Sequence, residues 1–362
     1  MRIAKFMALG ILISMLAAGS ALAFHDGGVA ECAGCHTMHN LQDGAPVDTV
    51  NVTGNQYLLK ADGATDTCLM CHAAYGQMNG GLGYGPGGDF YWVTKTYTWS
   101  SHGHGYSSEG DSHGHNVISP AYGIAVDATL DVAPGGTFDS DYLGCTSCHD
   151  PHGNQNFRIL YASNTDGPIT GSTRYDFDEA APVAVGNSRR TNKGDSGAEA
   201  NDNHTLYISG MADWCANCHI NIHSGNTTNT VHETGVALGT YADAYNQYVD
   251  SDDLTGGSQA SAYWGLVPFE SVDADTSMLR GPDSNDQVTC IPCHRSHASA
   301  FPDIARWDMT ETFIADSHPQ PTDVGYTAAD GANMYYDYTF TTVNQRSLCN
   351  KCHAKDAYDA PY

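Results

Sequence analysis

Basic residues and long apolar runs are both scarce in this chain of 362 residues. It has 15 Lys and Arg against 41 Asp and Glu, which gives a formal net charge of −26. So acidic a surface repels the phosphates of nucleic acids and of anionic lipids, and neither is expected as a partner. Beyond the N-terminus, no apolar stretch is long enough to span a bilayer, so membrane insertion is not expected either.

The N-terminus carries the one notable apolar run. Arg2 and Lys5 precede the apolar residues 6–18, and small residues follow up to Ala23. This pattern is typical of a secretory signal with cleavage after Ala23, and the run is too short for a membrane span. We predict a signal peptide over residues 1–23 and a single exported domain over residues 24–362, because no clean boundary divides the rest.

Every cysteine of the chain belongs to one repeated motif. All 12 Cys fall into six copies of Cys-x-x-Cys-His, the attachment pattern of haem c. The two thiols form thioethers with the haem vinyl groups, and the adjacent His becomes the proximal iron ligand. A redox dithiol or a zinc site would not require a His after every pair.

The motifs predict six covalent haem c groups. The attachment residues are Cys32, Cys35, Cys68, Cys71, Cys145, Cys148, Cys215, Cys218, Cys290, Cys293, Cys349 and Cys352. The proximal iron ligands are His36, His72, His149, His219, His294 and His353.

Few stretches repeat apolar residues at the spacing of a helix or a strand, and the chain contains 39 Gly. We therefore predict a multihaem cytochrome c that is mostly coil, with short helices and little strand, in which the haem array is the core. Helices are expected over residues 204–223 and 238–249. The segments 101–115 and 163–203 are expected to be an irregular loop and a long polar excursion.

Each iron needs a sixth ligand or keeps an open position. Twelve His remain after the proximal six, twice the number required, so two His per iron is favoured over His with Met. Iron with two His ligands is closed to substrate and has a lower reduction potential than iron with His and Met.

Four of the spare His follow a proximal His by three or four residues: His39, His152, His223 and His297. Such neighbours point the same general way on a helical turn, so they cannot reach around their own haem to its opposite face. Each is expected to bind a different haem packed nearby; the alternative is a surface or propionate-binding role. The other distal candidates are His115 and His232, followed by His25.

Another open alternative concerns the His-rich segment, where His102, His104, His113 and His115 could bind a metal at the surface. The twelve haem propionates would add negative charge, which contacts with Arg and Lys or bound Ca²⁺ would offset. The sequence assigns no residues to Ca²⁺.

Several stretches resemble the OmcS-type hexahaem outer-surface cytochromes of metal-reducing bacteria. They include residues 24–40, Cys148-His149-Asp150-Pro151-His152-Gly153, residues 214–219 and residues 348–356. The number and order of the motifs match as well, whereas segments 101–115 and 163–203 differ from the family.

The resemblance implies extracellular electron transfer by a filament. Family members polymerise, all their irons have two His ligands, and a His just after the first motif binds a haem of the neighbouring protomer. Here that residue would be His39. The expected partners are further copies of the chain, other redox cytochromes and extracellular acceptors. The expected location is the outer surface or the extracellular space, reached through the periplasm.

Two other functions stay open. One is a monomeric periplasmic or outer-surface electron carrier. The other is a multihaem reductase, which needs an iron with an open position. None of the six motifs lacks its His, so we expect no enzyme.

Overall fold

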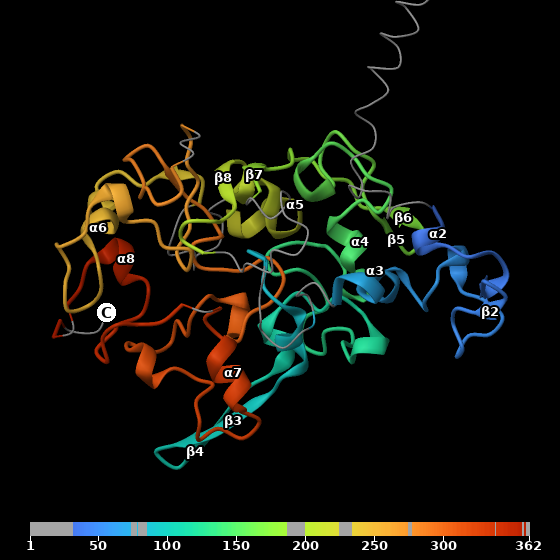
Figure 1. The fold of residues 1–362 in the computed structure, drawn as a ribbon, viewed down its shortest axis with the longest axis horizontal. Coiled ribbons are helices and arrows are strands. Elements are labelled where there is room, and N and C mark those ends of the chain that lie inside the picture. The colour runs from blue at the N-terminus through green and yellow to red at the C-terminus, as the bar shows by residue number, and fades with distance from the viewer. Residues whose placement is uncertain are drawn as a thin grey trace, which may run out of the picture.

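The computed structural model describes residues 32–73, 78, 85–186, 200–223, 234–273, 277–336, 338–356 and 358–359. Short helices and strands alternate with long stretches of turn and coil (Figure 1). The expected coil-rich fold is therefore confirmed. The predicted signal peptide, His25 and His232 lie outside the described residues.

Regular elements are short throughout the described chain. The α-helices are α2 (Cys32–Cys35), α3 (Ala64–His72), α4 (Cys145–Cys148), α5 (Met211–His223), α6 (Tyr241–Gln247), α7 (Ala328–Asn333) and α8 (Asn350–His353). The strands are β1 (Leu41–Gln42), β2 (Ala45–Pro46), β3 (Tyr97–Ser101), β4 (His104–Ser108), β5 (Ile169–Thr170), β6 (Thr173–Arg174), β7 (Val183–Val185), β8 (Leu206–Ser209), β9 (Val236–Ala237) and β10 (Gln287–Val288). They pair antiparallel as β1–β2, β3–β4, β5–β6, β7–β8 and β9–β10.

Two predicted helices are shorter in the structure. Helix α5 begins at Met211 rather than at residue 204, because residues 206–209 pair with β7 and Gly210 adopts a φ of 82°. Helix α6 covers only Tyr241–Gln247 of the predicted 238–249. Tyr241 is half exposed, whereas Tyr245 and Tyr248 are buried.

The prediction of an irregular loop over residues 101–115 is wrong. Strands β3 and β4 form a regular hairpin here, and Trp99 stacks on its cross-strand partner Tyr106. Aromatic pairs of this kind stabilise two-stranded sheets. Within the predicted excursion 163–203, the described part forms the β5–β6 hairpin and β7.

A protein core is present besides the haem sites. Buried aromatic and aliphatic side chains from residues 90–124 and 238–348 form one cluster. Its largest fully buried members include Trp92, Tyr245 and Trp307. The chain therefore buries more of its own apolar surface than the sequence led us to expect.

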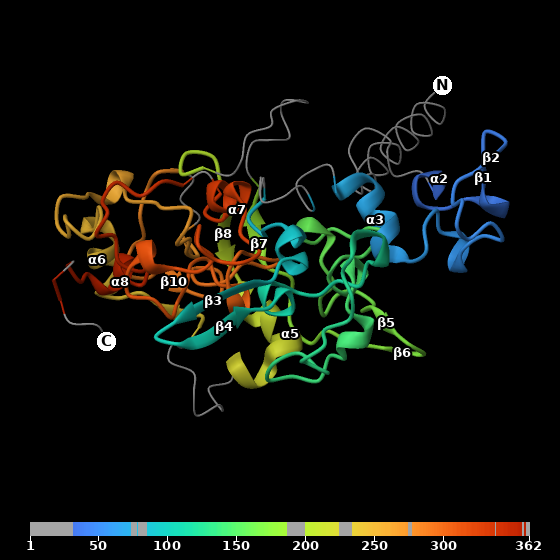
Figure 2. The same cartoon turned by 90° about the horizontal axis from the view of Figure 1, so that it is seen from below.

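The molecule is elongated, and its two ends carry different motifs. Helix α2 and strands β1 and β2 lie at one end of the long axis, and helices α6 and α8 lie at the other (Figures 1 and 2). The first and the last Cys-x-x-Cys-His motifs are thus at opposite ends.

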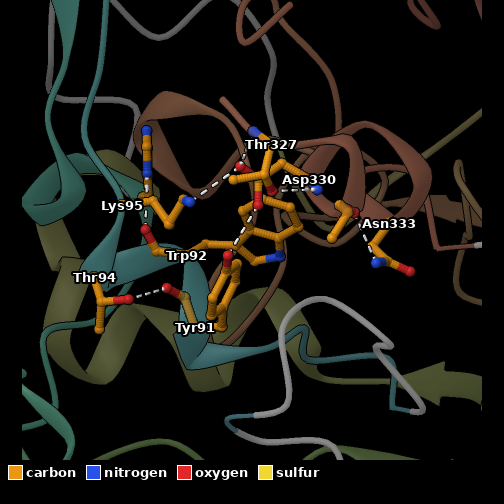
Figure 3. Close-up of polar contacts among 9 residues, drawn as sticks. Tyr91, Trp92, Thr94, Lys95, Thr327, Asp330 and Asn333 are labelled. Atoms are coloured by element: carbon orange, nitrogen blue, oxygen red, sulfur yellow. Dashed lines mark hydrogen bonds and ion pairs between the residues drawn. The ribbon is translucent and has the colours of Figure 1, made fainter. Parts of the chain in front are cut away.

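An ion pair with a fully buried carboxylate joins the residues before β3 to helix α7. The Lys95 amine lies 3.1 Å from the Asp330 carboxylate, which also accepts hydrogen bonds from the Tyr91 hydroxyl and the Thr327 backbone N–H (Figure 3). Thr327 in turn caps the first turn of α7 by accepting from the Asp330 N–H. The Asp330 side chain is fully buried, so its charge depends on these three donors.

We expect Asp330→Ala to destabilise the protein by about 2 kcal/mol, because it removes the partner of the partly buried Lys95 and the acceptor of the Tyr91 and Thr327 hydrogen bonds. Thermal unfolding followed by circular dichroism measures the effect. Asp166→Ala is the control: Asp166 pairs with Arg174 at 3.7 Å, but its side chain is 89% exposed. Equal unfolding temperatures for the two variants would contradict a stabilising role for this pair.

Candidate haem-binding site

Each attachment motif is built on a single helical turn. The backbone N–H of the His donates to the carbonyl of the first Cys in four motifs, at 2.9–3.0 Å for His36, His149, His294 and His353. One helical turn places residues three apart on the same side, so both thiols of a motif face one macrocycle. Helices α3 and α5 carry the second and fourth motifs inside longer elements.

The first, third and fifth motifs share a larger unit. In each, the His ring Nδ1 bonds to a backbone carbonyl in a downstream 3₁₀ turn: His36 to Tyr57 at 2.9 Å, His149 to Arg158 at 2.8 Å, and His294 to Asp303 at 2.7 Å. The three turns are η3 (Gln56–Leu58), η9 (Phe157–Ile159) and η12 (Pro302–Ile304).

The turns share an uncommon backbone conformation. The residue that supplies the carbonyl and the one after it both have a positive φ, between 50° and 59°. Such values are rare for residues other than Gly, and rarest for β-branched Ile. The three units therefore have the same construction, although their turns begin 20, 8 and 8 residues after the His.

These bonds fix which ring nitrogen can bind a metal. A carbonyl only accepts, so Nδ1 carries the proton and Nε2 keeps its lone pair for the iron. The fourth motif reaches the same state, because Nδ1 of His219 bonds to the Pro134 carbonyl at 2.8 Å.

A single cavity connects the motifs. It has a volume of about 2340 Å³ and includes Cys residues from all six motifs in its lining. His72, His149, His219 and His294 also face it. Thiols from all six motifs along one largely apolar cavity, together with oriented imidazoles in four of the motifs, fit the attachment of haem c. No disulfide forms among the described residues, so every thiol is available for a thioether.

The motifs follow one another through space in chain order. The second and third motifs meet through Cys68 and Cys145, whose thiols lie within hydrogen-bonding reach. The fourth and fifth meet in the same way through Cys215 and Cys290. Electrostatic proximity links the remaining neighbours: Cys35 with Cys68, Cys148 with Cys218, and Cys293 with Cys349.

Three proximal His rings face a second His at one characteristic distance. Ring centroids are 6.5 Å apart for His36 and His152, 6.3 Å for His149 and His297, and 6.1 Å for His219 and His115. Two imidazoles that bind one metal from opposite sides, each with a metal–nitrogen distance of about 2 Å, have centroids about 6 Å apart. The spacing suits an iron between the rings of each pair.

Two of these partner rings are partly buried. Burial lowers the pKa of His115 to about 4 and that of His297 to about 3, which keeps both imidazoles neutral, the form that binds iron. His115 is oriented by the Ser296 carbonyl, which accepts from its Nδ1 at 2.8 Å.

The other candidates have different surroundings. His39 is exposed at the molecular end that carries α2, with a φ of 59°. His223 is the last residue of α5, and its side chain is not described. His113 uses both ring nitrogens, at 3.0 Å from the Trp92 carbonyl and 2.6 Å from the Ser108 hydroxyl, so neither is free for a metal.

The His-rich segment does not gather its rings. His113 points into the protein, His115 lies against residue 296, and His102 and His104 are exposed on the hairpin. In the described part of the chain, no three His, Cys, Asp or Glu side chains are placed to hold a metal ion. Among the described helices, none has the length and apolar character of a membrane span.

The chain is similar to a curated protein along nearly its whole length. It is 38% identical to the c-type cytochrome OmcS of Geobacter sulfurreducens, over 94% of this chain and 96% of OmcS. The chain belongs to the OmcS family of c-type cytochromes. Haem c is accordingly its cofactor, and the channel described above fits that group.

Two solved structures extend the similarity to the fold. They are cryo-EM structures described as the OmcS nanowires and the Outer Membrane Cytochrome S filament of Geobacter sulfurreducens, with TM-scores of 0.71 and 0.74. Each is 33% identical, and each match covers 92% of this chain and 100% of the solved one. No family model matches the chain.

The hydrogen bonds that orient the proximal His rings could not be predicted from the sequence. The carbonyls that orient the proximal rings are backbone atoms, so they have no residue-type signature. A faint signal exists in Asn55-Gln-Tyr-Leu-Leu59 and Asn156-Phe-Arg-Ile-Leu160, which align around the first two turns. The third turn lacks the Asn, which hides the repeat.

Gly87 leaves the space that the His297 ring occupies. A Cβ at this position would lie 2.8 Å from Nδ1 of His297, closer than real Cβ contacts. If His297 binds the iron opposite His149, Gly87→Ala should displace its ring, so that one haem becomes high-spin in electron paramagnetic resonance. Gly85→Ala is the control, because a Cβ there meets nothing within 4 Å. A wholly low-spin Gly87→Ala protein would contradict this role for His297.

Proposed function

We propose that the protein moves electrons outside the cell along six haem c groups, and that protomers join end to end into a filament. The protein would be secreted by a signal peptide over residues 1–23 and would fold as one hexahaem domain over residues 24–362. The observation that carries the proposal is the single cavity with Cys from all six motifs in its lining, together with the proximity of Cys from consecutive motifs. Neighbouring haems in such a channel would lie close enough for electron exchange.

The three His pairs support an offset scheme of iron ligation. His152 belongs to the third motif but faces the proximal His36 of the first. His297 belongs to the fifth motif but faces His149 of the third. Each odd-numbered haem would thus be closed by the spare His two motifs further along. This agrees with the expectation that such a His serves a haem other than its own.

Applied to the fifth haem, the same offset of two motifs requires a His from another protomer. The fifth haem, on His294, has no later odd-numbered motif to close it, and His39 of the first motif has no earlier haem to serve. His39 is exposed at one end of the molecule. We therefore assign His39 to the fifth haem of a neighbouring protomer, where the bond would be both an iron ligand and a polymer joint.

The remaining irons are assigned less directly. His115 would close the fourth haem opposite His219. The second and sixth haems would take their distal ligands from His223, His232 and His25. With two His on every iron, no open position is left for substrate turnover, and we propose an electron-transfer role rather than an enzyme.

Surface chemistry at the α2 end favours self-association. Met38, Val50, Val52 and Tyr57 are between 67% and 94% exposed, close together in the chain and beside the first motif. An apolar surface of this kind in an acidic protein calls for a partner that covers it. The names of the two similar solved structures, nanowires and a filament, favour a second copy. Other redox cytochromes or extracellular acceptors would meet the ends of the polymer.

Negative-stain electron microscopy of the protein sheared from cells or shed into the medium tests the polymer directly. We expect filaments many protomers long, because each protomer offers His39 at one end and an unclosed fifth haem to its neighbour. Discrete particles alone would favour the monomeric carrier instead.

A second prediction tests the proposed bond between His39 and the fifth haem of a neighbouring protomer. His39→Ala should leave six haems per chain but remove one iron ligand, so filaments shorten or vanish and one haem becomes high-spin. His104→Ala is the control, since His104 is also exposed but lies on the β3–β4 hairpin. Normal filaments with unchanged low-spin spectra for His39→Ala would refute the joint.

A further inference from the structure

The sixth motif contains a charge that the other five lack. The two residues between the cysteines are Ala-Gly, Leu-Met, Thr-Ser, Ala-Asn and Ile-Pro in the first five motifs, and Asn-Lys in the sixth. Lys351 therefore lies between the two thioether positions of one haem. An ammonium group held close to a haem changes the relative free energies of its ferric and ferrous forms.

Lys351 is buried, with only 3% of its surface exposed. Its Nζ donates to the Tyr248 carbonyl at 2.9 Å and lies 4.5 Å from the Tyr245 ring centroid and 5.9 Å from that of Trp264. The negative ring faces and the carbonyl dipole stabilise the cation where it stands.

No carboxylate neutralises this charge among the described residues. The partly buried Lys95 differs in this respect, because it pairs with Asp330. A second cation stands nearby in the same segment: Arg346 is 1% exposed, and its guanidinium donates to the carbonyls of residues 356 and 359. Its Nη2 has no hydrogen-bond partner in the described part of the chain. Lys351 and Arg346 are therefore two buried cations in the segment that carries the sixth motif, inside a protein that is strongly negative overall.

We propose that Lys351 is a fixed positive charge that raises the reduction potential of the haem attached to Cys349 and Cys352. The reaction is the one-electron reduction of Fe(III) to Fe(II), with a neighbouring haem as the electron donor. The iron–porphyrin unit loses one positive charge in this step. A nearby cation repels the ferric form more than the ferrous form and so favours reduction, and the effect is strong because water is excluded.

The consequence concerns the distribution of electrons along the chain of haems. Helix α8 lies at the end of the molecule opposite α2 (Figures 1 and 2). An electron within a protomer would therefore reside preferentially on the haem at that end, beside the junction with the next copy. This inference rests on the proposed haem at the sixth motif, and it adds a tuning role that iron ligation alone does not supply.

Spectroelectrochemical titration of the purified six-haem protein at pH 7 tests the inference, with Lys351→Gln as the variant. Gln removes the charge but can still donate to the Tyr248 carbonyl. We expect the component of highest potential to lose about tenfold in its equilibrium constant for reduction, or about 59 mV for a one-electron couple. Lys351→Arg, which keeps the charge, should restore that component.

Controls separate charge from structure. Lys60→Gln makes the same charge change beside the first motif, where the amine is half-buried and bonds to Gln42; it should leave the component of highest potential in place. Lys351→Leu is a second neutral variant that fills the aromatic pocket and should behave like Lys351→Gln. Haem content and low-spin signals are recorded for each protein.

Two results would overturn the inference. One is a titration of Lys351→Gln and Lys351→Leu that matches the wild type. The other is an equal downward shift in Lys351→Arg, which would assign the effect to packing. Fewer than six haems in the wild-type protein would instead remove the proposed function, and this inference would fall with it.

Discussion

The rest of the molecule depends on the hydrogen bond from a proximal imidazole Nδ1 to a backbone carbonyl. It selects the tautomer that leaves Nε2 free, and it fixes the plane of the ring before any metal binds. In the first, third and fifth motifs, the carbonyl comes from a turn with two successive left-handed residues. Such conformations cost free energy, so their recurrence at three equivalent places indicates a functional constraint.

A spare His in one motif lies opposite the proximal His of a motif two positions earlier, which connects segments far apart in the chain. A spare imidazole three residues after a proximal ligand cannot serve its own haem, and the structure places His152 and His297 opposite the rings of earlier motifs. Iron ligation of this kind would tie distant chain segments together, as a disulfide does in another protein. The protein core around Trp92 and Trp307 supports this arrangement but does not replace it.

How much the sequence predicts depends on where the information lies. Haem attachment and the coil-rich fold follow from Cys spacing and weak periodicity, both of which are local. The start of helix α5 at Met211 was missed, because Gly210 and the pairing of β8 with β7 override a helical pattern. The exclusion of His113 as a ligand required the structure, since one ring nitrogen bonds to the Trp92 carbonyl and the other to the Ser108 hydroxyl. The environment of Lys351 likewise comes from residues 245–264, far away in sequence.

A cryo-EM reconstruction of the assembled protein at side-chain resolution tests the offset scheme most directly. The account predicts that the iron on His36 is closed by His152 and the iron on His149 by His297, both within one protomer. It also predicts that the iron on His294 is closed by His39 of an adjacent protomer. An iron bound by the spare imidazole of its own motif, or a His294 iron closed from within its own chain, would contradict the account.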